Sequence, residues 1–196
     1  LWGGSIKLNT PLLFAVGFVG MFTIGGLSGI THSMVPSDYQ QQDTYYIVAH
    51  FHYVLFGGSI FALFGGAYYW FPKFTGRLMN ETLGQINFWT LLVGFNLTFF
   101  PMHMSGLLGM PRRIYTYSEG QGWDLWNLMA TIGAFIIAFS VLTFAINLVL
   151  SARAFQKTVC RQKRCAYPSV TGAVGKNPLD CVRRGDIRPL RVNLIG

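Results

Sequence analysis

The chain has 196 residues, of which 52% are hydrophobic and only 11% are charged, a composition too apolar for an ordinary soluble domain. Its net charge is +8, but ten of the fifteen Lys and Arg residues follow position 150. A nucleic-acid-binding protein would carry its basic residues within the folded domain. We therefore predict an integral membrane protein that lies in a lipid bilayer and binds no nucleic acid.

Four apolar segments follow one another along the chain, each close to the ~20 residues that a membrane-spanning helix needs. They cover about 11–30, 44–70, 82–107 and 126–150. Residues that favour helix caps precede the first two segments, Asn9 or Thr10 and Asp43. Asn80 with Glu81 lies at the start of the third, and Asp124 lies near the start of the fourth. The sequence therefore predicts an all-α integral membrane fold with four transmembrane helices.

Three prolines give further detail about these predicted helices. Pro11 suits the first position of the first helix, where a missing N–H group costs little. Pro72 is expected to follow the end of the second helix, and Pro101 is expected to kink or loosen the last turns of the third.

We divide the chain into a transmembrane portion, 1–155, and a tail, 156–196. The tail is basic, polar and without periodicity, and its three cysteines (Cys160, Cys165 and Cys181) fit no zinc-binding spacing. If the four helices alternate in direction, thirteen of the fifteen cations share one side of the membrane. The positive-inside rule then places the tail on the cytoplasmic or matrix side. The abrupt start of the chain, without Met or a signal peptide, suggests the later part of a longer protein.

Two histidines, His50 and His52, lie two residues apart in the second apolar segment. A helix turns by about 100° per residue, so the two rings point about 200° apart and do not easily share one metal ion. Haem fits between membrane helices and needs one axial histidine on a given face. The pair therefore indicates two cofactors, one on each side of the helix, or histidines that only hydrogen bond to neighbouring helices.

Charged residues on the same predicted outer side accompany the histidines. Arg112 and Arg113 could each bind a haem propionate, or else lie in a solvated loop. Asp38 and Asp43 could bind a hard cation or share a proton with a propionate, or else serve as turn and cap residues. His103, near the outer end of the third segment, is a further candidate axial ligand, whereas His32 is expected to lie too near the surface.

At four stretches the sequence resembles a known family. These are 25–30 (Gly-Gly-Leu-Ser-Gly-Ile), 43–54 around the histidine pair, 70–76, and 99–113 with its Gly-Met-Pro-Arg-Arg ending. Over about 1–155 the chain closely resembles subunit I of the haem–copper oxidases, specifically the aa3-type cytochrome c oxidases. The four helices resemble the last four of the twelve in that subunit.

The resemblance implies roles for the residues on the histidine helix. His50 resembles the proximal ligand of the high-spin haem a3, where oxygen is reduced, and is thus the catalytic residue. His52 resembles an axial ligand of the low-spin haem a, and Phe51 resembles the residue between the two haems. His103 matches a family histidine that is not a haem ligand. Copper B belongs to the complete site, but its ligands lie outside this chain.

The resemblance also implies roles for the charged residues. Arg112 and Arg113 resemble partners of the haem propionates, and Asp38 resembles a carboxyl group near a propionate of the high-spin haem. Asp43 resembles a ligand of a magnesium ion. A histidine precedes that aspartate in many family members, whereas this chain has Gln42, so the sequence leaves the magnesium site open.

The function that the resemblance implies is part of a terminal respiratory oxidase, which reduces O₂ to water with four electrons and pumps protons. Expected partners are the remaining helices of subunit I, subunits II and III, and cytochrome c. A quinol oxidase of the same superfamily, a standalone bis-histidine cytochrome and a non-enzymatic fragment are the alternatives. The stretches 70–76 and 112–117 favour a bacterial plasma membrane over the mitochondrial inner membrane.

Overall fold

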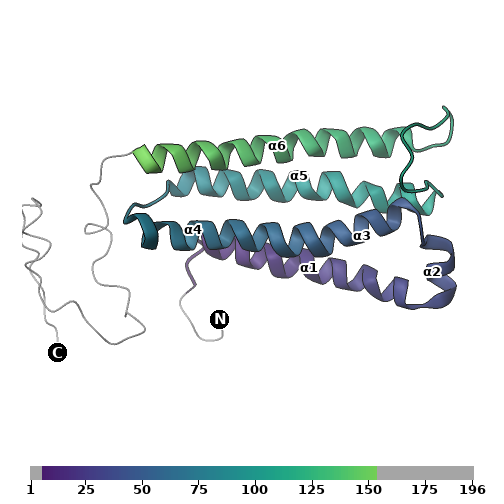
Figure 1. Cartoon of the computed structure of the whole chain (residues 1–196), viewed down its shortest axis with the longest axis horizontal. Coiled ribbons are helices and arrows are strands. Elements are labelled where there is room, and N and C mark those ends of the chain that lie inside the picture. Colours follow the sequence, from purple (N-terminus) through teal and green to yellow (C-terminus); the bar gives the residue numbers. More distant parts are fainter. Residues whose placement is uncertain (1–5, 154–196) are drawn as a thin grey trace, which may run out of the picture. The chain divides into compact units, whose positions relative to one another are not determined.

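A computed structural model of the chain describes residues 6–153, and these are mainly helical (Figure 1). Helices cover each of the four apolar segments. In chain order the elements are α1 (Thr10–Ser33), α2 (Val35–Gln41), α3 (Tyr45–Leu55), the π-helical turn η1 (Phe56–Ile60), α4 (Phe61–Thr75), α5 (Glu81–Leu107) and α6 (Asp124–Arg153). The predicted tail and its three cysteines lie outside the described residues.

The helices α3, η1 and α4 form one continuous column of 31 residues, Tyr45–Thr75. This column contacts α1 on one side, and its α3 part also packs along α5, which in turn pairs over most of its length with α6 (Figure 1). The short helix α2 and the loop between α5 and α6 lie at the same end of the bundle. That end also carries the start of α3, and therefore the histidine pair.

The beginning of the histidine helix differs from the prediction. Thr44, not Asp43, caps α3, because its hydroxyl accepts a hydrogen bond from the Tyr46 N–H group at 3.2 Å. Asp43 has a φ of 60°, in the left-handed region that is unusual for a residue with a side chain. At the start of α5 the side chain of Asn80 accepts hydrogen bonds from the Thr82 and Leu83 N–H groups, so Asn80 caps this helix.

Neither interior proline ends its helix. Pro72 was expected to follow the second helix, but α4 continues through it to Thr75. Proline removes one N–H donor, and near a helix end this costs a single hydrogen bond. The helix ends instead at Gly76, which adopts a φ of 69° and donates its N–H to the Pro72 carbonyl at 3.0 Å. Pro101 is buried inside α5, which continues to Leu107.

The helix α2 was not predicted, because its residues are mostly polar and the segment is short. Its first turn contains Pro36, whose fixed φ favours the start of a helix. Asp38 lies in that first turn as well, where a negative charge stabilises exposed N–H groups. The loop that was expected to carry Asp38 is therefore helical.

The core consists mainly of aromatic rings from α1, α3, α4 and α5. Its buried members are Phe14, Tyr53, Phe61, Phe64, Tyr68, Phe88, Leu91, Phe95 and Phe99. Many of these rings meet edge to face, for example Phe14 and Phe88 at 5.2 Å between centroids, a geometry that aromatic quadrupoles favour. This packing holds α3 between α1 and α5.

Small and polar residues line the contact between α5 and α6, which we call the α5–α6 seam. A Cβ atom added to Gly94 would lie 2.9 Å from the Ile137 backbone nitrogen, so the helices approach closely where that side chain is missing. Asn87 is fully buried, and its amide donates to both the carbonyl and the hydroxyl of Ser140 at 2.9 Å. The Ser140 hydroxyl donates back to the Asn87 carbonyl at 2.7 Å.

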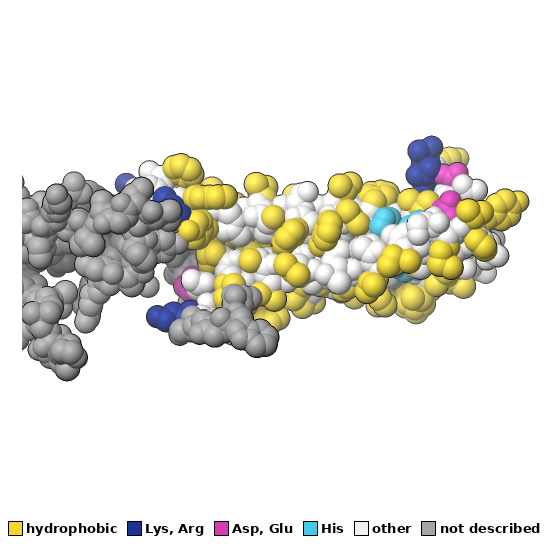
Figure 2. Space-filling model, turned by 90° about the horizontal axis from the view of Figure 1, so that it is seen from below, with side chains coloured by type: hydrophobic (Ala, Val, Ile, Leu, Met, Phe, Trp, Pro, Cys, Tyr) yellow, Lys and Arg dark blue, Asp and Glu magenta, His cyan; other side chains and the backbone are white. Residues whose placement is uncertain are grey.

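Three helical segments are long and apolar enough to cross a membrane: Thr10–Ser33, Tyr45–Thr75 and Asp124–Arg153. Hydrophobic side chains cover the face shown in Figure 2, while most of the visible acidic and basic side chains gather towards the ends. The 27-residue helix α5 is not among the three, and it carries polar residues such as Asn87, Asn96 and His103. A fourth membrane span therefore stays a prediction.

Candidate functional site: two histidines on one helix

The rings of His50 and His52 contact different neighbours of α3. The His50 ring lies against α1, with its Nδ1 atom 2.8 Å from the Ser28 hydroxyl oxygen. The His52 ring stacks on Phe99 of α5, at 4.2 Å between centroids and 14° between planes. With a single residue between them, the two imidazoles thus face different helices. Both rings are half-buried.

Hydrogen bonds define which nitrogen of His50 carries the proton. The Ser28 hydroxyl donates its only proton to the Gly25 carbonyl at 2.9 Å. Its oxygen must therefore accept from His50, so Nδ1 is the protonated nitrogen; this tautomer is assigned from the hydrogen-bond network. The lone pair of the neutral ring then lies on Nε2.

His52 has the same tautomer, which a hydrogen bond within its own helix fixes. Its Nδ1 atom lies 2.7 Å from the Val48 carbonyl oxygen, four residues earlier. A carbonyl oxygen only accepts hydrogen bonds, so Nδ1 carries the proton and Nε2 the lone pair. The neighbouring Phe51 ring stacks beside His52 at 4.5 Å between centroids.

Both histidines therefore have the form that an axial iron ligand needs. A metal-bound histidine coordinates through one nitrogen and usually donates the other N–H group to a protein oxygen. Among residues 6–153, neither Nε2 atom of the pair has a hydrogen-bond partner. That same stretch holds no cluster of three or more His, Cys, Asp or Glu side chains that could bind a metal ion. The donor set fits two haems with one axial ligand each, and not a metal ion held by this chain alone.

The loop before α3 pairs with the loop after α5. Thr44 and Pro111 form an isolated antiparallel bridge. The Tyr45 N–H group donates to the Met110 carbonyl at 2.9 Å, and the Arg112 N–H group donates to the Asp43 carbonyl at 2.8 Å. This pairing fixes the arginine loop beside the start of the histidine helix.

The side chains of Asp43 and Arg112 also bind each other. The Arg112 Nε atom donates to Asp43 Oδ1 at 2.6 Å, and a terminal guanidinium nitrogen pairs with the same oxygen. Arg113 is exposed, with a left-handed φ of 68°. The structure thus brings Asp43 and Arg112 together, while Arg113 takes no part in this ion pair. Sequence reasoning did not anticipate this ion pair, whose members are 69 residues apart.

His32, which was expected to be too superficial, lies close to His50. Their ring centroids are 5.0 Å apart, and the His32 Nδ1 atom lies 3.6 Å from Asp38 Oδ1. Both His32 ring nitrogens are buried without a hydrogen bond. The expectation that His32 lies at the surface is therefore wrong, because α1 extends to Ser33 and α2 folds beside it.

His103 is a buried residue in the interior of the bundle. Its ring packs against Tyr46 and Tyr53, at 5.0 and 5.6 Å between centroids. Its Nδ1 atom lies 3.3 Å from the Phe100 carbonyl oxygen. These contacts give His103 a role in packing α3 against α5.

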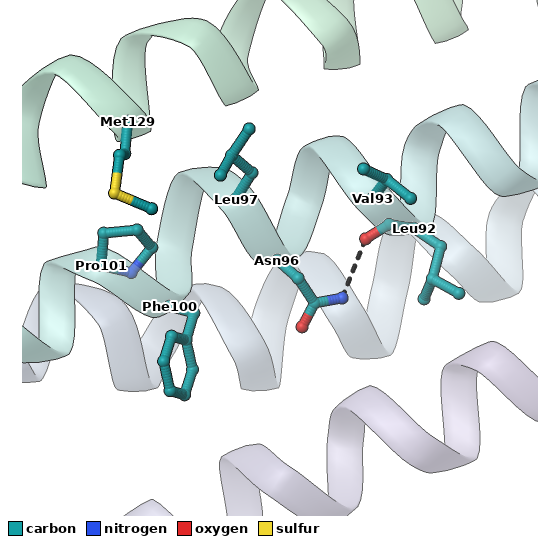
Figure 3. A pocket seen from close by; sticks show the side chains of 7 residues that line it. All are labelled: Leu92, Val93, Asn96, Leu97, Phe100, Pro101 and Met129. Atoms are coloured by element: carbon teal, nitrogen blue, oxygen red, sulfur yellow. Dashed lines mark hydrogen bonds between the residues drawn. The ribbon is translucent and has the colours of Figure 1, made fainter.

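An open apolar groove lies elsewhere, where α5 meets α6 (Figure 3). Its lining consists of Leu92, Val93, Asn96, Leu97, Phe100, Pro101 and Met129. The one polar side chain there, Asn96, donates its amide to the Leu92 carbonyl at 2.8 Å. None of the predicted site residues lines this groove, so it has no part in the candidate site.

The comparisons with known proteins all match this chain to the same oxidase subunit. The family described as "Cytochrome C and Quinol oxidase polypeptide I" matches residues 1–160. Cytochrome c oxidase subunit 1 of Bacillus sp. (strain PS3) is 50% identical over 157 residues, which are 80% of this chain and 26% of the relative. Cytochrome c oxidase subunit 1 of Thermostichus vulcanus is 55% identical over 151 residues, 77% of this chain and 27% of the relative.

A solved structure also has the same fold. A chain from the cryo-EM structure of a heme-copper terminal oxidase dimer superimposes with a TM-score of 0.66 at 19% sequence identity, over 76% of this chain and 28% of that chain. This chain therefore spans about a quarter of the length of the relatives that it matches.

Proposed function

Because this chain belongs to the cytochrome c and quinol oxidase polypeptide I family, we propose that it is the haem-ligating part of the catalytic subunit of a terminal respiratory oxidase. The complete enzyme reduces O₂ to water with four electrons and pumps protons across the membrane. The observation that carries the proposal is the pair of Nε2 atoms on α3, each free while Nδ1 is held by a protein oxygen.

Haem, when bound, would supply an iron that accepts and releases single electrons and at which oxygen could be reduced. We assign His50 to the high-spin haem a3 and His52 to the low-spin haem a. The backbone between them, with Phe51, sets the spacing of the two ligands. Since their rings face different helices, each histidine holds its own haem.

The charged loops hold the polar edges of the haems. Asp43 fixes Arg112 at the start of α3 through two of its guanidinium nitrogens, which leaves one nitrogen for a propionate. Arg113 is exposed beside it and would bind a second propionate on the outer side. Asp38, half-buried beside His32, is the proposed carboxyl group near the high-spin haem.

Asp43 does not fit a magnesium site in this chain alone. Its Oδ1 atom is bound to Arg112, and its neighbour Gln42 is exposed. Magnesium takes six oxygen ligands in a regular octahedron, which one partly engaged carboxylate does not supply. We derive no step through this ion.

The proposal places the helices as the last four of a twelve-helix subunit, with α5 as the fourth span. The other helices of subunit I would supply the copper B ligands, and subunits II and III would complete the enzyme. The setting is a bacterial plasma membrane, with the tail on the cytoplasmic side and cytochrome c as electron donor.

Separate His50→Ala and His52→Ala variants of the membrane complex that contains this chain test the assignment. Reduced-minus-oxidised spectra should lose the high-spin haem signal in the first variant and the low-spin signal in the second. His103→Gln is the matched control and should keep both signals. Retention of both haems in both alanine variants would refute the proposal.

A quinol oxidase is the second candidate, since the family description names both electron donors. The haem ligands would be the same, so the alanine variants do not distinguish the two. Turnover of the purified complex with reduced cytochrome c, compared with turnover on a quinol, decides between them. We expect oxygen consumption with reduced cytochrome c.

A further inference from the structure

Ser28 occupies a position on α1 to which the proposed function assigns no role. A serine inside a helix commonly donates its hydroxyl proton to a carbonyl of the preceding turn, as Ser28 does with Gly25. Its oxygen then still has acceptor capacity, and the His50 Nδ1–H group uses it at 2.8 Å. The result is a chain of two hydrogen bonds from the imidazole, through a hydroxyl, to the α1 backbone.

The second histidine has no such dependence on a side chain. His52 donates to the Val48 carbonyl of its own helix, an acceptor that any residue at that position supplies. His50 also interacts with the Gly25 carbonyl of α1, but the Ser28 hydroxyl is a side-chain acceptor that a single substitution can remove. Ser28 therefore distinguishes the environments of the two proposed iron ligands.

Close packing of α1 against α3 gives the hydroxyl its fixed position. A Cβ atom added to Gly29 would lie 3.0 Å from His50 Cε1, so the ring rests on the bare backbone next to Ser28. A Cβ atom added to Gly25 would lie 3.0 Å from the Val54 backbone nitrogen. Glycines before and after Ser28 thus keep the two helices near enough for the hydrogen bond.

We propose that Ser28 is a positioning residue for the axial ligand of the high-spin haem. Its hydroxyl holds the Nδ1–H tautomer of His50, sets the rotation of the ring, and makes Nε2 a stronger donor to iron. Partners that accept the second N–H group of a metal-bound histidine raise the basicity of the ligand and orient its ring. This inference rests on the proposed assignment of His50 to that haem.

The experiment compares Ser28→Ala with Ser28→Thr in the complete membrane complex. Loss of the acceptor should lower the iron–histidine stretching frequency of the reduced high-spin haem in resonance Raman spectra. It should also raise the midpoint potential of that haem, since a weaker donor stabilises the ferric state less. Threonine keeps a hydroxyl on Cβ and should restore both values.

Two controls separate this effect from a general disturbance of α1. The low-spin haem in the same sample should keep its spectrum and potential. Thr23→Ala removes a hydroxyl that also binds a carbonyl of its own helix, that of Val19 at 2.7 Å. This variant should leave both haems unchanged.

The outcomes distinguish the inference from the proposed function. If His50→Ala removes the high-spin signal while Ser28→Ala leaves the stretching frequency and potential unchanged, only the role of Ser28 is refuted. If Ser28→Ala prevents haem insertion, Ser28→Cys, with a weaker acceptor of similar size, should give shifts in the same direction. Equal loss of haem in the alanine, cysteine and threonine variants overturns a role that depends on the hydroxyl.

Discussion

Polar groups in the α5–α6 seam pair with one another, whereas ring nitrogens in the histidine region around His32, His50 and His52 have no partner in the described part of the chain. In the seam, Asn87 and Ser140 exchange hydrogen bonds until the amide protons and both hydroxyl functions are used. In the histidine region, the Nε2 atoms of His50 and His52 have no partner within residues 6–153, and neither has a ring nitrogen of His32. Both regions lie in one bundle of similar apolar composition.

The difference separates a structural contact from a binding region. A buried polar group without a partner costs about 1–3 kcal/mol, so a helix contact that only holds the fold satisfies its polar groups internally. Open nitrogen atoms remain where a further group is to be bound. Substitutions in the seam should therefore change the stability of the protein, and substitutions in the histidine region should change the haem spectra.

Gly94→Ala should lower stability more than the substitutions at Asn87, Phe99 and Asp43 described below. The added Cβ would lie 2.9 Å from the Ile137 backbone nitrogen and 3.1 Å from the Gly133 carbonyl oxygen. Backbone atoms of a helix cannot relieve such a contact by a change of rotamer, as a side chain can. Overpacking of this kind costs about 1–3 kcal/mol, and we expect the upper part of that range. Thermal unfolding of the purified complex in detergent measures the loss.

Gly20→Ala on α1 is the matched control, since a Cβ atom there meets nothing within 4 Å. Alanine favours a helix by up to ~1 kcal/mol over glycine, so the control should melt at the same temperature or higher. If both variants lose the same stability, close approach of α5 and α6 is not the cause.

Asn87→Leu comes next in size. Leucine has the same number and branching of side-chain heavy atoms as asparagine but lacks the amide that donates to Ser140. Hydrogen bonds between membrane helices contribute about 0.6–1.7 kcal/mol each, so a loss of about 1–2 kcal/mol is expected, with both haem spectra unchanged. An Asn87→Leu, Ser140→Ala double variant should lose less than the sum of the single losses; additive losses would contradict the coupling.

Phe99→Leu examines the histidine region. The substitution removes the ring that stacks on His52 at 4.2 Å, and aromatic pairs contribute about 0.5–1.5 kcal/mol beyond their burial. We expect a loss near 1 kcal/mol, together with a shift of the low-spin haem band and an unchanged high-spin band. Phe100→Leu, at a half-exposed neighbouring position, should shift neither band.

Asp43→Asn should have the smallest effect. Asp43 is 70% exposed and its partner Arg112 is 30% exposed, and ion pairs near water contribute up to about 1 kcal/mol. The melting temperature should fall slightly at low salt, and the difference should shrink at high salt because ions screen the pair. Glu119→Gln in the loop between α5 and α6 is the control. A loss that salt does not change would argue against an electrostatic origin.

The sequence predicts those features that depend on nearby residues. Long apolar runs indicated where helices lie, and Asn80 at the start of the third run was already a local sign of its beginning. Gly76, which ends α4, is also a local signal, because glycine favours the left-handed conformation. The prediction instead ended that helix at about residue 70, before Pro72, and so gave proline too much weight near a helix end.

Features that depend on distant residues could not be predicted. The pairing of Asp43 with Arg112 and the hydrogen bond from His50 to Ser28 join segments 69 and 22 residues apart. No property of a lone serine in an apolar helix distinguishes an imidazole partner from the usual backbone carbonyl. The placement of His32 beside His50 likewise depends on how α1 packs against α3.

The π-helical turn η1 has a consequence for the whole column. A π-helix forms i→i+5 hydrogen bonds, so it accommodates an extra residue compared with an α-helix. The turn Phe56–Ile60 begins four residues after His52. The extra residue therefore changes the direction in which the side chains of α3, which carries the two histidines, face relative to those of α4, whose rings fill the aromatic core. If this turn became α-helix with every residue retained, one half of the column would rotate by about 100° relative to the other. Either the imidazoles or the core rings would then face the wrong neighbours.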